Sequence, residues 1–195
     1  PTIDPPDRKT LDDYKRAAEK CNRAAELAKS AGIPTAVVDH KPFGKNREAF
    51  ERALQSELEK HRIEIVVLAG FMRILTAWFV SQWDGRMINI HPALLPMFKG
   101  LDTHKRALQA GVATHGATVH FVVPEMDSGP IIAQGSVPVL QDDTEATLAA
   151  RVLKIEHRIY PLSLKLVAEG RVRIADGICI IDGVAQPNGV QISGA

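Results

Sequence analysis

Residues suited to proton transfer stand at the end of a short apolar run. Asn89 and His91 belong to the segment Asn89-Ile-His-Pro-Ala-Leu-Leu-Pro96, which follows Met87 and Ile88. In an extended strand, side chains two residues apart point to the same face. An amide beside an imidazole suits acyl transfer, because the amide stabilises an oxyanion and the imidazole moves the proton of a nitrogen. The alternative is a polar pair that only satisfies its own hydrogen bonds beside a turn.

An acidic residue follows a second strand-like run. Asp127 lies in Met126-Asp-Ser-Gly-Pro130, after the alternating run 117–123, in which His120 is expected to line the same site. Asp, Ser, Gly and Pro are also ordinary turn residues, so a plain turn is the alternative. Spacing alone does not place Asp127 beside His91. The histidines show no compact ligand spacing, so we expect no catalytic metal.

Helices and strands alternate along the chain around these residues. Apolar residues at helical spacing predict helices over 11–31, 47–60, 103–110 and 144–169, the last interrupted before Pro161. Runs rich in β-branched residues predict strands over 33–38, 63–70, 87–90, 117–123 and 131–137, with two short strands around Gly177. This order predicts an α/β fold, a largely parallel sheet flanked by helices with a Rossmann-like first half. In such sheets, sites gather beyond the carboxyl ends of strands, where Asn89 and His91 would lie.

Composition narrows the class of partner. The 195 residues include 24 basic and 23 acidic side chains, a formal charge of +1, and no long block of like charge. We therefore expect no nucleic-acid partner. Cys21 and Cys179 lie far apart, and no run has membrane-spanning length or the form of a signal peptide. These features predict a soluble, cytoplasmic protein without a membrane partner, present as a monomer or homodimer.

Five segments occur together in an order that resembles a known family. They are Ala69–Leu75, Asn89–Pro96, Gly116–Val122, Met126–Ile131 and Glu156–Pro161. Together they resemble the folate-dependent formyltransferases over residues 24–185, and the first and last segments favour the phosphoribosylglycinamide formyltransferase branch. The resemblance implies a formyltransferase-like fold. It also implies transfer of a formyl group from 10-formyltetrahydrofolate to the amine of glycinamide ribonucleotide, in purine biosynthesis.

The resemblance also implies roles for three residues. Asn89 would donate a hydrogen bond to the developing oxyanion, and His91 would act as acid and base while the tetrahedral intermediate breaks down. Asp127 would orient His91 and favour its imidazolium form, because a nearby carboxylate stabilises that charge.

A larger set is implied for substrate binding. Backbone groups of Arg73 and Leu75 would hydrogen-bond the pterin, Arg47 would reach the glutamate carboxylate of the folate, and Glu156 would grip the ribonucleotide. For Met72, Ile74 and Leu75 the alternative is plain core packing. The residues implied to bind the reduced folate are Arg47, Met72, Arg73, Ile74, Leu75, Asn89, Val123, Pro124, Glu125, Met126 and Asp127.

The start of the chain departs from the family pattern. Family members begin with a hydrophobic strand and a glycine-rich turn that holds the ribonucleotide phosphate, whereas this chain has no glycine before Gly32. We therefore predict an atypical N-terminal segment (1–22), a formyltransferase domain (23–185) and a C-terminal tail (186–195). The missing loop supports one alternative, a non-catalytic folate-binding module that lacks the phosphate loop. The resemblance also leaves a second alternative, a formyltetrahydrofolate hydrolase, which transfers the formyl group to water.

Overall fold

The computed structural model describes residues 23–194, and the chain divides into two units after Pro42. In the first unit, residues 23–30 are helical. The start of the helix predicted over 11–31, and the predicted N-terminal segment 1–22, lie outside the described residues. A short 3-10 helix, η1 (Lys41–Phe43), follows.

The strand predicted over residues 33–38 is wrong. These residues have neither helix nor strand, and Ile33 and Val37 are 57% and 90% exposed. A β-branched run becomes a strand only where a neighbouring strand shares its hydrogen bonds, and no described strand pairs with this one.

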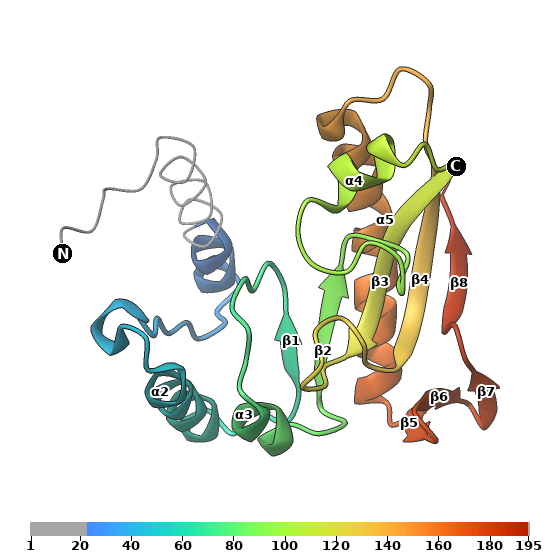
Figure 1. Ribbon diagram of the computed structural model, residues 1–195. Coiled ribbons are helices and arrows are strands. Elements are labelled where there is room, and N and C mark those ends of the chain that lie inside the picture. Colours follow the sequence, from blue (N-terminus) through green and yellow to red (C-terminus); the bar gives the residue numbers. More distant parts are fainter. Residues whose placement is uncertain (1–22, 195) are drawn as a thin grey trace, which may run out of the picture. The chain divides into compact units, whose positions relative to one another are not determined.

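The second unit is built on a five-stranded sheet (Figure 1). Its strands, in spatial order, are β1 (Val66–Leu68), β2 (Met87–His91), β3 (Thr114–Phe121), β4 (Ile131–Pro138) and β8 (Val190–Ser193). The pairs β1–β2 and β4–β8 are parallel, and β3 is antiparallel to both of its neighbours. Four of these five strands therefore share one direction. The predicted α/β fold with a largely parallel sheet is confirmed, with β3 as the reversed strand.

One long helix covers one face of this sheet. Helix α5 (Glu145–Ala168) packs along β3 and β4 (Figure 1) and buries Ile155 and Ile159 against them. Gly135 on β4 permits this contact, because a Cβ at that position would lie 2.3 Å from the Ile155 side chain. The main hydrophobic core therefore lies between α5 and the sheet.

Helix α5 corrects a second prediction. The expected interruption before Pro161 is wrong, since the helix runs through this residue without a break. Proline inside a helix costs about 3 kcal/mol. Ile155 and Ile159 before Pro161 and Leu166 after it are buried in the same core, and each such side chain contributes about 1.5–3 kcal/mol. Burial on both sides of the proline thus outweighs its local cost.

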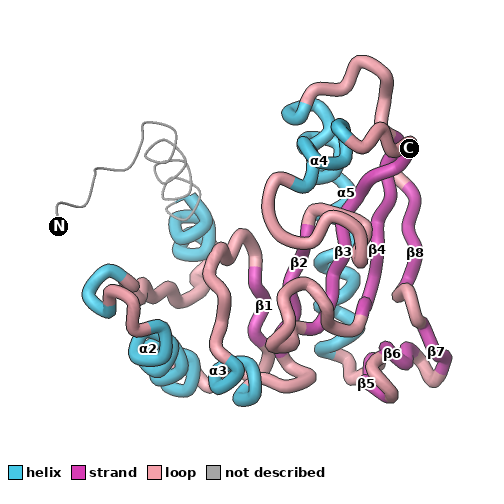
Figure 2. The backbone as a smooth tube through the Cα atoms, in the orientation of Figure 1, coloured by secondary structure: helices cyan, strands magenta, loops and turns pink. Residues whose placement is uncertain are grey.

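Two helices pack together with the starts of β1 and β2. Helix α2 (Arg47–Lys60) and helix α3 (Ala77–Gln82) share a second apolar cluster that contains Phe79 and Met87. Helix α2 has the predicted bounds, whereas α3 was not predicted. Helix α4 (Thr103–Gln109) follows β2 and confirms the helix predicted there (Figure 2). None of the helices within residues 23–194 is both long and apolar enough to span a bilayer.

A small antiparallel sheet follows α5. It contains β5 (Val172–Ala175), β6 (Ile178–Ile181) and β7 (Val184–Gln186). Asp176 and Gly177 both have positive φ, 50° and 75°, as a two-residue hairpin turn requires. The two short strands predicted around Gly177 are confirmed, whereas β7 and β8 were not predicted. Strand β8 lies inside the predicted tail and pairs with β4, while the domain boundaries themselves stay predictions.

Candidate active site

Strand β2 presents Asn89 and His91 on the face of the sheet turned away from α5. Ile88 lies in the core beneath α5, and side chains alternate between the two faces along a strand. On the neighbouring β3, His120 lies opposite Asn89 and Thr118 lies opposite His91. Four polar side chains, two from each strand, therefore lie side by side on this face of the sheet.

Asp127 lies beside His91. The 122–130 loop joins β3 to β4, and in it Asp127 has a φ of 50°. Its Oδ2 lies 3.5 Å from His91 Nδ1 and accepts a 2.9 Å hydrogen bond from the Gly100 backbone N–H. Both side chains are nearly buried, at 7% exposure for His91 and 12% for Asp127. The structure thus makes the contact that sequence spacing could not place.

Gly129 allows the 122–130 loop to fold back against β3. A Cβ on Gly129 would lie 1.8 Å from the carbonyl oxygen of Phe121. At the base of the loop, the Phe121 N–H donates to the Pro130 carbonyl at 2.9 Å, and at its tip Lys99 Nζ donates to Ser128 Oγ at 2.6 Å. The loop that carries Asp127 is therefore held at its base and at Ser128.

A backbone carbonyl fixes the orientation of the His91 ring. His91 Nε2 lies 3.0 Å from the Phe98 carbonyl oxygen, which can only accept a hydrogen bond. Nε2 therefore carries a proton, and Nδ1 faces Asp127. Phe98 has a φ of 55°, and its ring packs edge-on against His115 with centroids 5.7 Å apart. The imidazole thus has an acceptor opposite each nitrogen, an arrangement that can hold an imidazolium ion.

His120 is the buried partner of Asn89. The His120 Nδ1–H donates to the Phe121 carbonyl at 2.8 Å, and Asn89 Nδ2 donates to His120 Nε2 at 3.4 Å. Burial lowers the pKa of His120 more than the Phe121 carbonyl and Asp127 raise it, which keeps the ring neutral. Nε2 therefore remains an acceptor, and one hydrogen of the Asn89 amide is left to point elsewhere. His120 was predicted to line the site, but its contact with Asn89 was not predicted.

A buried polar network supports the turn after His91. Thr118 Oγ–H donates to the Ala93 carbonyl at 2.7 Å and accepts from the Leu95 N–H at 3.0 Å. Gln134 Nε2 donates to the Leu95 carbonyl at 2.8 Å and to Thr118 Oγ at 3.0 Å. Thr118 and Gln134 were not predicted as supporting residues. Their signal is polarity at fully or almost fully buried positions, which is costly without partners.

The residues predicted to bind the pterin lie in the 69–76 loop, which leaves β1. Leu68, the last residue of β1, pairs with Asn89, so this loop starts beside strand β2. Met72 and Ile74 are 71% and 58% exposed, whereas Leu75 packs against the apolar cluster of α2 and α3. The Leu75 side chain therefore packs in the core, whereas the side chains of Met72 and Ile74 expose apolar surface to solvent.

The remaining residues predicted for the folate lie on two other elements. Arg47 is the exposed first residue of α2. Val123, Pro124, Glu125 and Met126 precede Asp127 in the 122–130 loop, and Met126 is 56% exposed. The second loop therefore presents apolar surface directly beside the carboxylate.

Glu156 lines a cavity that does not include Asn89, His91 or Asp127. This cavity, of about 510 Å³, lies between β1 and α5, and Tyr160 on its wall donates a 2.5 Å hydrogen bond to the Leu68 carbonyl. Ile90, which points to the α5 face of β2, also lines it, whereas Asn89, His91 and Asp127 do not. The structure thus groups three of the predicted residues and places Glu156 apart from them.

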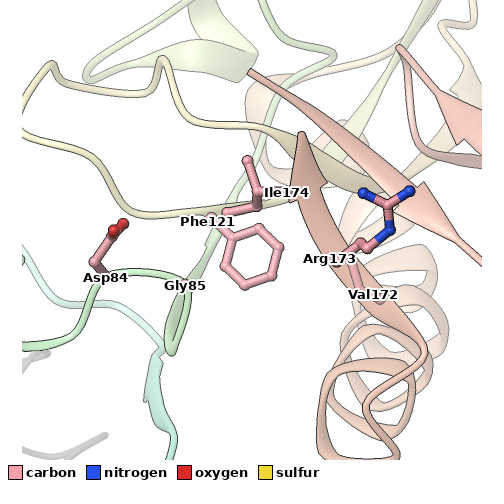
Figure 3. A pocket seen from close by; sticks show the side chains of 6 residues that line it. All are labelled: Asp84, Gly85, Phe121, Val172, Arg173 and Ile174. Atoms are coloured by element: carbon pink, nitrogen blue, oxygen red, sulfur yellow. The ribbon is translucent and has the colours of Figure 1, made fainter. Parts of the chain in front are cut away.

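A second cavity, of about 380 Å³, contains none of the predicted residues. Figure 3 shows Asp84 and Arg173 on opposite sides of the Phe121 ring that lines it. Within residues 23–194, no three His, Cys, Asp or Glu side chains are grouped closely enough to hold a metal ion.

Comparison with known proteins shows the family of the chain. A family model described as formyl transferase matches residues 17–164. The chain is 51% identical over 159 residues to the trifunctional purine biosynthetic protein adenosine-3 of Homo sapiens. The matched stretch covers 80% of the chain but only 16% of that protein. It is 46% identical over 162 residues to the phosphoribosylglycinamide formyltransferase of Escherichia coli (strain K12), covering 83% of the chain and 76% of that enzyme.

A solved structure extends the likeness to three dimensions. The phosphoribosylglycinamide formyltransferase of Coxiella burnetii superposes with a TM-score of 0.81 at 42% identity, over 87% of this chain and 80% of that one. The chain belongs to the formyl transferase family. Within the family it is similar to phosphoribosylglycinamide formyltransferases over most of its length.

Proposed function

We propose that the chain is a phosphoribosylglycinamide formyltransferase, which transfers the formyl group of 10-formyltetrahydrofolate to the amine of glycinamide ribonucleotide in de novo purine biosynthesis. One observation carries the proposal: His91 is held between Asp127 and the Phe98 carbonyl, next to Asn89 on the same strand face. A neutral amide donor and an oriented imidazole are the two groups that transfer of a formyl group between nitrogens requires. The relatives that bear this name support the choice of substrates.

In the first step, the amine nitrogen attacks the formyl carbon. A carbon–nitrogen bond forms, and the electrons of the carbonyl bond move to its oxygen. Asn89 stabilises this oxyanion with the amide hydrogen that His120 does not use. His120 contributes by orienting the Asn89 amide, which it does through its unprotonated Nε2.

In the second step, the bond between the formyl carbon and N10 of the folate breaks. N10 must gain a proton and the attacking nitrogen must lose one, so the transfer needs a group that does both. His91 delivers the proton to N10 and recovers one from the amine, with a bound water as the carrier. Asp127 keeps the ring oriented and balances its positive charge while the proton is held.

Both substrates have a place in this arrangement. The exposed side chains Met72, Ile74 and Met126 supply apolar walls for the pterin, and the backbone at Arg73 and Leu75 supplies its polar anchors. Arg47 pairs with the folate carboxylate. Glu156, in its cavity beside β1, binds the ribonucleotide.

The test is a formyl-transfer assay with the purified chain. Tetrahydrofolate release is measured with glycinamide ribonucleotide present, and again with water as the only acceptor. Release that needs the ribonucleotide supports the proposal, and equal release without it identifies a hydrolase. Folate binding measured by calorimetry, without either reaction, identifies a non-catalytic module.

The matching variant is His91→Ala, with His91→Asn as a more conservative partner. Because His91 carries the proton in the second step, we expect transfer to fall by about 10²–10⁴-fold while thermal unfolding changes little. Near-normal turnover in a folded variant would remove His91 from the mechanism.

A further inference from the structure

Helix α2 buries a carboxylate that the proposed reaction does not use. Glu51 is 1% exposed, and it is the only Asp or Glu among the buried residues that the structure describes. A buried carboxylate is unfavourable unless hydrogen bonds replace its water shell. The position of Glu51 therefore depends on the groups that it meets.

Both carboxylate oxygens of Glu51 meet one residue, Thr76. Glu51 Oε1 accepts a hydrogen bond from the Thr76 backbone N–H at 2.8 Å, and Oε2 accepts one from the Thr76 hydroxyl. Thr76 is the N-cap of α3, and its hydroxyl oxygen accepts from the Phe79 N–H at 3.3 Å. Glu51 thus fixes the point where the 69–76 loop ends and α3 begins.

The neighbouring residue of α2 holds the same loop at a second point. The Arg73 guanidinium lies over the Phe50 ring, 5.1 Å from its centroid, and Phe50 is 6% exposed. The 69–76 loop contains no helix or strand that could fix its shape from within. One turn of α2 therefore holds this loop on both sides of Ile74 and Leu75.

We infer that Glu51 is a positioning residue for the 69–76 loop, and that through Thr76 it sets the backbone of Arg73–Leu75 in the shape that binds the pterin of the formyl donor. This inference rests on the proposed function, in which that backbone anchors the pterin. Anchors displaced by about 1 Å bind and orient a ligand much less well. Glu51 touches no substrate and acts only through the loop.

The expected signature is a selective loss of donor binding. In Glu51→Gln and in Thr76→Val, the 69–76 loop loses charge-assisted hydrogen bonds, so we expect the Kd for 5-formyltetrahydrofolate to rise roughly tenfold or more. The KM for the donor rises with it, whereas kcat and the KM for the ribonucleotide stay close to wild type. Thr76→Ser keeps the hydroxyl and should restore binding. Glu59→Gln, an exposed carboxylate on the same helix, is the matched control.

Hydrogen exchange supplies a readout that needs no ligand. Peptides that span 69–79 should exchange faster in Glu51→Gln and Thr76→Val, with no change in β2, β3 or α5. Unchanged exchange at 69–79 overturns the inference, and so does local loosening without any change in donor Kd. Faster exchange throughout the sheet, with a lower Tm in both variants, also overturns it by showing a general structural role. Failure of the wild-type chain to bind the folate instead overturns the proposed function, and it is seen without any variant.

Discussion

Thr118→Val tests whether the buried network holds the turn that follows His91. Thr118 is fully buried, and its hydroxyl makes three hydrogen bonds, to the Ala93 carbonyl, the Leu95 N–H and Gln134. Valine keeps the branched shape but leaves the carbonyl and the N–H of the turn without this partner. Each such buried group costs about 1–3 kcal/mol, so we expect a loss of about 2–4 kcal/mol in the free energy of unfolding. That is a large fraction of the roughly 5–15 kcal/mol of a typical domain.

Thr118→Val should also lower kcat for formyl transfer. The turn begins at the residue after His91, so a shift of about 1 Å in it is expected to lower kcat by about ten- to hundredfold. Urea unfolding gives the free energy, and the formyl-transfer assay gives kcat. Thr114→Val, at the exposed start of the same strand, is the control. The reasoning is refuted if Thr118→Val changes the unfolding free energy by less than about 0.5 kcal/mol and leaves kcat intact.

A double variant sharpens this test. Thr118 and Gln134 share a hydrogen bond, so Thr118→Val and Gln134→Leu should not have additive effects on stability. An interaction energy of about 0.5–3 kcal/mol is expected for residues in one network. Strict additivity would show that the two side chains act on the turn independently.

Two further predictions follow from burial. Burial above all, and the neighbouring His104 next, lower the pKa of His115 from 6.5 to about 4, so the ring gains a proton more readily in the unfolded chain than in the folded one. The contribution of neutral His115 to stability is therefore complete above pH 6.5 and is lost as the pH falls toward 4. Urea midpoints measured across this pH range should drop less in His115→Phe than in the wild type. Gly135→Ala places a methyl group 2.3 Å from Ile155 Cγ1 and should lower the free energy of unfolding by about 1–3 kcal/mol. Adding Ile155→Val to this variant should recover part of the loss. An unchanged free energy of unfolding in Gly135→Ala would contradict the packing described for α5.

Local patterns predicted strand β2 but not the whole candidate site. Alternation along β2 was enough to place Asn89 and His91 on one face, and helical spacing gave α2 its bounds. Asp127 reaches His91 only because the 122–130 loop folds back over Gly129, a contact between segments that no local pattern encodes.

The two wrong predictions have opposite causes. Residues 33–38 have the composition of a strand but no described partner strand, so local propensity overestimated their order. Pro161 has a helix-breaking identity, yet burial on both sides of it keeps α5 continuous, so local propensity underestimated the order there. In both cases tertiary contacts decided the outcome.

The 122–130 loop limits how the sequence of this protein can vary. Surface loops usually tolerate insertions and deletions, because their length is not tied to anything else. Here the base is closed by the bond from Phe121 to Pro130, the tip is tied to Lys99, and Asp127 between them must meet His91. The number of residues in this loop therefore determines where Asp127 lies relative to His91. Single substitutions at its exposed positions Pro124 and Glu125 can be tolerated, whereas a single inserted residue would move the carboxylate away from the imidazole that it orients.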